Sequence, residues 1–166
     1  CYNNSVSLSA DRWRSLGETL LKSIPECMFH SRSLACKKPY GAAPAGQKVE
    51  FAAYPRREQG ISRMTLWVEE DGQQAEAFPM RWFGLAGARD EYGASFTPPH
   101  AGLYWYWFTF DTADGPRFCA RGYGGRCEVL DSMGDRFQLT VYDPSYRPPR
   151  WFGEGITYNI FPDRFC

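Results

Sequence analysis

The sequence has 166 residues, of which 43% are hydrophobic, 17% aromatic and 23% charged. This composition supports a packed core and excludes an intrinsically disordered chain. The 19 basic and 19 acidic residues balance, so no basic stripe marks a nucleic-acid-binding protein. No apolar run approaches the ~20 residues of a membrane-spanning helix. We therefore expect neither nucleic acid nor a membrane as a partner.

The first predicted element is a helical N-terminal extension at residues 9–24. Ser9 can cap its start, and Pro25 follows its end. Four apolar residues fall on one face at helical spacing, Trp13, Leu16, Leu20 and Ile24. A partly disordered terminal extension is the alternative.

From Cys27 onward, short apolar runs alternate with turn residues. The predicted strands are 27–30, 48–55, 63–70, 75–84, 91–99, 102–110, 116–122 and 135–143. Pro79 indicates an edge strand. Hairpin turns are predicted at the Asp-Gly pair (71–72) and at "DTADG" (111–115). Residues 122–135 are predicted to form a long glycine-rich loop. Many short strands with regular turn signals are typical of an antiparallel, immunoglobulin-like β-sandwich.

The end of the sequence departs from this pattern. Residues 144–155 hold three prolines and two glycines and predict a linker, anchored by Trp151. A further apolar strand follows from Ile156, without a partner in the remaining sequence. We therefore divide the chain into an extension (1–29), a β-sandwich (30–146), and a linker with an orphan strand (147–166).

The six cysteines, at positions 1, 27, 36, 119, 127 and 166, leave two interpretations open. No two have the C-x-x-C spacing of a zinc site, and we predict neither a metal site nor a cofactor. The spacing favours the first interpretation, a cytoplasmic protein with six reduced thiols. The second interpretation is a disulfide between Cys119 and Cys127 across a short hairpin. No leader precedes a cleavage site, so an extracellular location would require that a signal peptide had been removed.

The segment "WFGEGITYNIFPDRF" (151–165) resembles the entry into the catalytic barrel of bacterial α-amylase-family glycoside hydrolases such as neopullulanases, cyclomaltodextrinases and amylopullulanases. The barrel-entry motif comprises Tyr158, Asn159, Ile160, Phe161, Pro162, Asp163, Arg164 and Phe165. Asn159 stands where the family usually has Gln. The segments 30–55, 102–110 and 137–151 are similar to the N-terminal β-sandwich of the same enzymes, so the resemblance covers roughly residues 30–166.

This resemblance implies that the orphan strand is the first strand of a (β/α)₈ barrel, which needs ~250 residues. The chain would then be the N-terminal module of a bacterial, starch-active enzyme. Its implied partners are the barrel of the same parent chain, an α-glucan oligosaccharide and, as in neopullulanase-like relatives, a second subunit in a homodimer. The alternative is a free-standing β-sandwich interaction domain with no link to carbohydrate.

We predict no catalytic residue in this chain. The resemblance implies that the reacting Asp and Glu residues lie on later barrel strands. Asp163 and Arg164 would be scaffold, and His30 and His100 are expected to be structural. Glycoside hydrolysis requires two carboxyl groups that flank the scissile bond, so we expect this chain to hydrolyse no glycosidic bond.

Aromatic residues are the candidates for carbohydrate binding. Both faces of the strand at 102–110 are aromatic, so the face away from the core needs a cover. That cover would be a loop or the N-terminal helix, the missing barrel or a second subunit, or a sugar. Sugar rings lie flat on exposed Trp and Tyr rings, and the residues near turns, Trp82, Trp67 and Tyr92, are the better candidates. Trp82 is the first to test, with packing on a loop as its alternative role.

Overall fold

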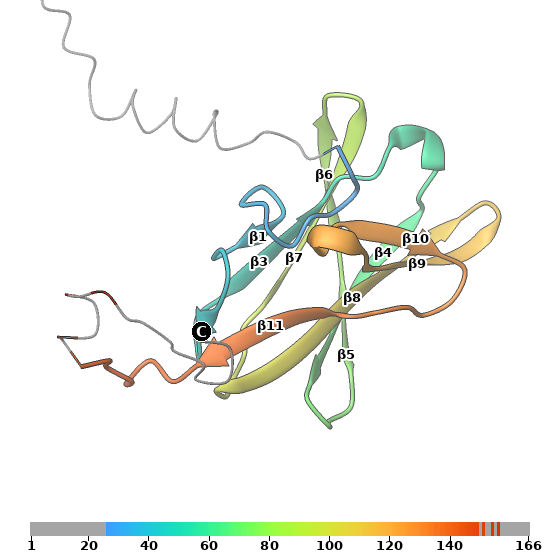
Figure 1. The fold of residues 1–166 in the computed structure, drawn as a ribbon. Helices are drawn as coiled ribbons and strands as arrows, with labels where there is room; N and C mark the ends of the chain where they lie inside the picture. The colour runs from blue at the N-terminus through green and yellow to red at the C-terminus, as the bar shows by residue number, and fades with distance from the viewer. Residues whose placement is uncertain (1–25, 150, 152–153, 155, 157–166) are drawn as a thin grey trace, which may run out of the picture.

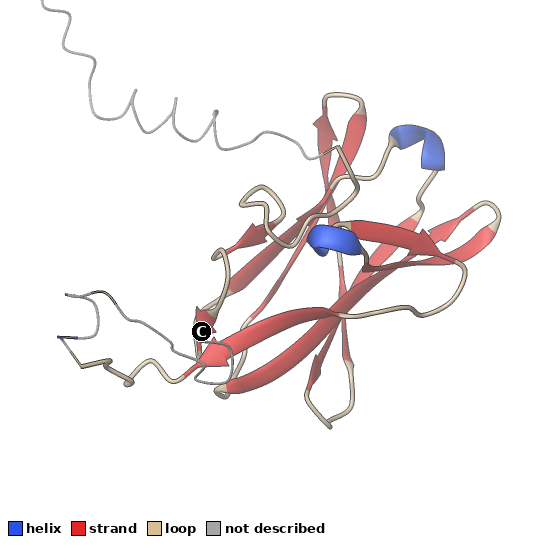
Figure 2. Cartoon of the chain, in the orientation of Figure 1, coloured by secondary structure: helices blue, strands red, loops and turns tan. Residues whose placement is uncertain are grey.

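The computed structural model describes residues 26–149, 151, 154 and 156. These residues form eleven strands and two single-turn 3-10 helices, Arg57–Gln59 and Tyr123–Gly125 (Figure 2). The strands form two sheets, which confirms the predicted all-β sandwich, whereas its immunoglobulin-like detail stays a prediction. The predicted helix at 9–24 and the barrel-entry motif at 158–165 lie outside the described residues.

The smaller sheet has four strands in the order β1-β3-β7-β6. Their bounds are Lys37–Lys38 for β1, Val49–Ala53 for β3, Arg89–Phe96 for β7 and Arg81–Ala86 for β6. All neighbours in this sheet are antiparallel. β3 lies between β1 and β7, and β6 forms one edge.

The larger sheet is organised around β8 (Gly102–Thr112), which pairs with β4 (Arg63–Glu70) along most of its length. On the side of β8 away from β4, two strands pair with β8 in succession. β11 (Phe137–Tyr142) pairs with its first half, and β9 (Gly115–Arg121) pairs with its second half. The outer strands are β5 (Glu76–Pro79) beside β4, β10 (Cys127–Leu130) beside β9, and β2 (Ala43–Pro44) beside β11.

The chain crosses from one sheet to the other at Met80. The sequence predicts a single strand over 75–84, but the structure has β5 in the larger sheet and β6 in the smaller one. Met80 is buried between them, and its backbone N–H donates to the carbonyl of Met64 at 2.8 Å. As a result, the β4–β5 and β6–β7 hairpins extend from opposite ends of the sandwich (Figure 1). Pro79 lies at the end of β5, which pairs with β4 alone, as expected for a proline on an edge strand.

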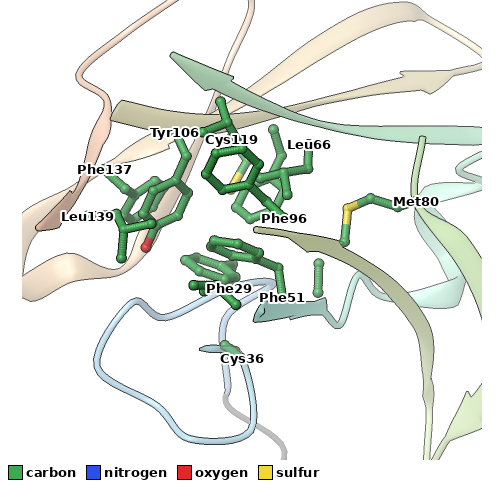
Figure 3. Packing of buried hydrophobic residues seen from close by; sticks show 14 of the residues in the cluster. Phe29, Cys36, Phe51, Leu66, Met80, Phe96, Tyr106, Cys119, Phe137 and Leu139 are labelled. Atoms are coloured by element: carbon green, nitrogen blue, oxygen red, sulfur yellow. The ribbon is translucent and has the colours of Figure 1, made fainter. Parts of the chain in front are cut away.

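The core forms between the two inner faces, and strand alternation selects its residues. Val49, Phe51 and Ala53 of β3 are buried, as alternation along the predicted strand at 48–55 requires. On β8 the buried set consists of Tyr104, Tyr106, Phe108 and Phe110. Phe29, Phe51, Tyr106 and Phe137 meet at the centre with ring centroids 4.9–6.0 Å apart (Figure 3). Aromatic pairs at such separations stabilise a core beyond their buried area.

The N-terminal edge of the sandwich begins before residue 30. Met28 and Phe29 belong to the core, and the Met28 carbonyl accepts a hydrogen bond from the Tyr54 N–H at 2.7 Å. The three-part division of the chain stays a prediction, but these two residues, which it assigned to the extension, pack within the sandwich.

Two details differ from the sequence-based expectation. The pairing of β11 with β2 is parallel, so the sandwich is not wholly antiparallel. The predicted loop at 122–135 contains the 3-10 turn at Tyr123–Gly125 and the strand β10. Four residues are too few to give a clear alternation, and Gly124 and Gly125, both with positive φ, obscured the strand that follows them.

Cys119 and Cys127 form a disulfide, with their Cα atoms 5.5 Å apart. It joins neighbouring strands, since β9 pairs with β10. The interpretation favoured from the spacing, with all thiols reduced, is therefore wrong for this pair. The spacing argument failed because a disulfide needs proximity in space, and here a hairpin supplies it. Among the described cysteines, Cys27 and Cys36 are free thiols.

Candidate functional site

A hollow of about 830 Å³ lies over the outer face of the smaller sheet. Its floor includes Ala52, Gly93 and Ser95, which lie on the face opposite the buried Phe51. Phe83 of β6 forms one wall, and Leu34, in the loop before β1, lies on the other side. We call this hollow the Phe83 groove. Small floor residues keep it open, and its walls carry exposed apolar side chains.

The position of Phe83 follows from an irregularity in the sheet. The register between β6 and β7 shifts between Trp82 and Gly84, so Phe83 is an extra residue in β6. A bulge of this kind redirects a side chain. The redirected ring of Phe83 lies over Gly93, where an added β-carbon would be 2.3 Å from Phe83 Cε2. Since Gly93 has no side chain, the ring can rest directly on the sheet, and its exposed fraction is 62%.

Charged side chains line the rest of the Phe83 groove in opposite pairs. Lys48 and Glu50 form an ion pair at 2.6 Å, and the hydrogen bond from Lys48 lowers the pKa of Glu50. Lys38 adds a second cation and Glu91 a second carboxylate, which accepts a hydrogen bond from the Tyr54 hydroxyl at 3.3 Å. The groove thus offers hydrogen-bond donors and acceptors with little net charge.

Lys37 supports the edge of the Phe83 groove from within. Its side chain is buried, with 3% exposed, and its Nζ donates to the carbonyls of Pro39 at 3.0 Å and Gly41 at 2.6 Å. Burial lowers the pKa of Lys37 to about 8. Through its two hydrogen bonds, the Lys37 ammonium group stabilises the turn that follows β1.

A second hollow, of about 730 Å³, lies between the β4–β5 hairpin and the β7–β8 connection. Glu70, Glu76 and His100 are among its polar residues. His100 Nδ1 lies 3.4 Å from Glu70 Oε2, and the imidazole is largely exposed. Its apolar wall is formed by Phe78, Phe96 and Tyr104, but these rings belong mainly to the core.

The three carbohydrate-binding residues predicted from the sequence do not come together in one site. Trp82 is half exposed, and its Nε1 donates to Asp90 Oδ1 at 2.9 Å. Tyr92 is its cross-strand neighbour, but only 8% of Tyr92 is exposed and its hydroxyl donates to the Ile61 carbonyl. Trp67 lies on the other sheet, on the outer face. Their roles in carbohydrate binding stay predictions.

The outer face of β8 is covered by side chains of its own sheet. Trp67 stacks on Trp107 with ring centroids 6.1 Å apart and an interplanar angle of 5°, and Trp107 is buried. The guanidinium of Arg136 lies 5.2 Å from the centre of the Trp105 ring, at cation–π distance. These contacts come from neighbouring strands of the same sheet, and the three covers expected from the sequence (a loop or the N-terminal helix, the barrel or a second subunit, or a sugar) stay predictions.

Phe83 is the residue that sequence reasoning missed. Regular alternation through "RWFG" (81–84) gives no sign that Phe83 is an extra residue of β6. The available signal was Gly84, whose φ is +139°, since an isolated glycine within a strand often marks a bulge. Gly84 can suggest a bulge, but only the register with β7 identifies Phe83 as the extra residue.

His30 and the 111–115 segment make local contacts, and the expected structural role of the histidines stays a prediction. His30 Nδ1 accepts a hydrogen bond from the Arg32 N–H at 3.1 Å, and burial, together with Arg126 and Arg32, lowers the pKa of His30. Within "DTADG", Ala113 and Asp114 form the turn between β8 and β9, which confirms the predicted hairpin. Within the described residues, no His, Cys, Asp and Glu side chains gather as a metal site would require, and no helix is long and apolar enough to cross a membrane.

The two-layer fold defines a β-sandwich module, and comparison with known proteins shows which enzymes it resembles. No family model matches the chain. The chain is 28% identical over 137 residues to an amylopullulanase of Thermoanaerobacterium saccharolyticum. The aligned region covers 78% of this chain and 10% of that enzyme. An amylopullulanase of Thermoanaerobacterium thermosulfurigenes is also 28% identical, over 78% of this chain and 7% of that enzyme. The chain thus spans about a tenth or less of the length of these relatives.

A solved structure of a cyclomaltodextrinase shares the fold. It aligns with a TM-score of 0.50 and 17% identity over 74% of this chain and 21% of that one. Together, these comparisons confirm the resemblance recognised from the sequence: the chain is similar to a part of α-amylase-family glycoside hydrolases.

Proposed function

We propose that the chain is a non-catalytic module of a starch- or α-glucan-degrading glycoside hydrolase. In this role the β-sandwich positions or stabilises a catalytic barrel of the same parent chain and contacts α-glucan. The observation that carries the proposal is the similarity to amylopullulanases, which covers 78% of this chain but only 7–10% of those enzymes. Such a ratio is expected when one module of a much larger enzyme is compared with the whole.

The environment of the carboxylates supports a non-catalytic role. A glycosidase needs one carboxylic acid with a raised pKa beside an ionised carboxylate. In this chain, Glu50 pairs with Lys48 at 2.6 Å, and the hydrogen bond from Lys48 lowers the pKa of Glu50, which is the opposite of what a general acid requires.

The partners and the location follow from the same proposal. The catalytic barrel of the parent chain is the first partner, and a second subunit in a homodimer is another. The barrel-entry motif would connect the module to that barrel. The disulfide between Cys119 and Cys127 favours an oxidising compartment, so we propose an extracellular enzyme rather than a cytoplasmic one.

Two assays on the purified 166-residue chain test this function. Incubation with soluble starch and with pullulan should release no reducing sugar above a buffer control. Native electrophoresis in gels with and without soluble starch should show retarded migration only where starch is present. Sugar release that rises in proportion to the chain and persists through further purification would refute the non-catalytic role, and unchanged migration would remove the α-glucan contact from the proposal.

A further inference from the structure

We propose that the α-glucan contact of this module is the Phe83 groove, with the Phe83 ring as the surface on which a sugar stacks. This inference rests on the proposed function, because it places the α-glucan contact of that function at one site. It differs from the expectation drawn from the sequence, in which Trp82 is the first candidate.

The first argument is the way in which Phe83 is held exposed. A large apolar ring that is 62% exposed loses the stabilisation that burial would give it. Here a bulge turns the ring to the outer face, and the missing side chain of Gly93 lets it lie on the sheet. Two backbone features thus cooperate to present one flat apolar surface, which is what stacking on the C–H face of a sugar requires.

The second argument is the character of the groove beside the ring. Its volume of about 830 Å³ falls within the range of small-molecule sites, which is about 300–1,000 Å³. Of its three lysines and two glutamates, the exposed Lys38 and Lys48 are balanced by Glu50 and Glu91, while Lys37 is buried with its Nζ bonded to backbone carbonyls. Charged groups form strong hydrogen bonds to neutral partners, and a balanced set attracts neither anions nor cations. These properties suit a neutral ligand rich in hydroxyl groups.

The third argument is that Trp82, Trp67 and the aromatic residues of the second hollow already make other contacts within the module. The indole N–H of Trp82 is bonded to Asp90, and Trp67 is stacked on Trp107 with its Nε1 bonded to Thr109 Oγ1 at 2.9 Å. The second hollow has its aromatic rings turned toward the core. The Phe83 groove therefore combines an exposed ring with polar groups better than these alternatives do.

Calorimetric titration of the 166-residue chain with maltoheptaose and β-cyclodextrin tests the inference. The variants are Phe83→Ala, Phe83→Tyr, Trp82→Ala and Leu85→Ala. Leu85 is the matched control, since it is also exposed on β6 but does not line the groove. We expect Phe83→Ala to raise Kd by about tenfold or more, as loss of one stacked ring should. Phe83→Tyr, Trp82→Ala and Leu85→Ala should stay within about twofold of the wild type.

The outcomes separate the inference from the function on which it rests. If Trp82→Ala abolishes sugar binding and Phe83→Ala does not, the site is not the Phe83 groove. The same holds if the two variants lose sugar binding to the same extent. In both cases the α-glucan contact itself stands. If the wild type binds neither sugar, the inference and the α-glucan contact both fail, while the proposed role beside the barrel is untouched. Unchanged circular dichroism and thermal unfolding of each variant would show that a loss of binding is local.

A second titration tests the neutrality of the ligand. Sulfated β-cyclodextrin has the same ring as β-cyclodextrin but carries many negative charges. A groove with balanced charges should bind it no more tightly than the neutral ring at physiological ionic strength. Tighter binding of the sulfated ring that Lys48→Gln weakens would overturn the assignment to a neutral α-glucan.

Discussion

The ring of Phe83 occupies the space above Gly93 that a side chain at position 93 would need. A β-carbon on Gly93 would lie 2.3 Å from Phe83 Cε2, which is well inside contact distance. The two residues are therefore coupled: one can rest on the sheet only because the other has no side chain. This coupling can be measured independently of any ligand.

The first prediction is a double-mutant cycle at these two positions. In the wild-type background, Gly93→Ala should displace the Phe83 ring and lower the free energy of unfolding. In a Phe83→Ala background the same change should raise it by about 0.5–1 kcal/mol, because alanine is favoured over glycine in a strand. Urea denaturation should give a coupling energy of about 1 kcal/mol. Equal effects in the two backgrounds would show that the residues do not interact.

The second prediction compares two buried tyrosines on the same face of β8. The Tyr104 hydroxyl donates to the His100 carbonyl at 3.1 Å, whereas the Tyr106 hydroxyl has no hydrogen-bond partner among the described residues. Tyr104→Phe should therefore lower the free energy of unfolding by about 1 kcal/mol, and Tyr106→Phe should leave it unchanged or raise it. Since the two substitutions remove the same atom, each is the control for the other. A larger loss for Tyr106→Phe in urea titrations would contradict the prediction.

The third prediction concerns pH and Lys37. Its pKa is about 8 in the folded chain, compared with an ordinary value of 10.5, because burial disfavours the charge. Between these two pH values the unfolded chain binds more protons than the folded chain, so the contribution of Lys37 to stability rises as pH increases. Measured against Lys37→Met, the wild type should gain on the order of 2–3 kcal/mol from pH 8 to 10.5.

The control for this experiment is Lys38→Met, a change at the exposed neighbour. The tyrosines that titrate at high pH are shared by all three proteins, so their effect cancels in the comparison. Lys38→Met and the wild type should show parallel dependences of the unfolding free energy on pH. If the unfolding free energies of the wild type and Lys37→Met also depend on pH in parallel, Lys37 is not desolvated in the folded chain.

The fourth prediction concerns the disulfide between Cys119 and Cys127. Reduction of Cys119–Cys127, which are eight residues apart in sequence, should lower the free energy of unfolding by about 2–3 kcal/mol. A Cys119→Ala/Cys127→Ala variant should have the stability of the reduced chain and no response to reductant. A full response of that variant to reductant would place the sensitive bond elsewhere.

The fifth prediction is that residues 26–149 fold without the rest of the sequence. Every residue of the described hydrophobic core lies between Met28 and Val141. A chain limited to 26–149 should therefore keep the thermal unfolding midpoint of the 166-residue chain within a few degrees, and should be more soluble if residues 156–166 are an unpaired apolar strand. Loss of cooperative unfolding would show that the sandwich depends on residues 1–25 or on the predicted linker and strand.

Strong alternation made the central strands predictable from the sequence. The segment "RMTLWVEE" forms β4 over the predicted residues, with Met64, Leu66 and Val68 buried, because one face of that strand meets the core and the other does not. The same reasoning located β3, β8 and β11. The resemblance to α-amylase-family enzymes was also available from short motifs, and the chain is 28% identical over 137 residues to an amylopullulanase.

The features that the sequence did not reveal depend on contacts between distant segments. The change of sheet at Met80 depends on its bond to Met64, and the bulge at Phe83 depends on the register with β7. Neither leaves a periodic pattern. The Phe83 groove arises from both features, so the pattern alone pointed to Trp82, the more conspicuous neighbouring aromatic residue.

The branched arrangement around β8 has a consequence for the rate of folding. Three strands pair with β8 over its length, and only β9 is adjacent in sequence. The β8–β9 hairpin can form by closing a very short turn, but β4 and β11 join it only after longer segments have been brought back to it. Folding dominated by such distant pairings takes milliseconds to seconds. Until β4 arrives, Trp105 and Trp107 face water, so their fluorescence should report the arrival of that strand as a later kinetic phase.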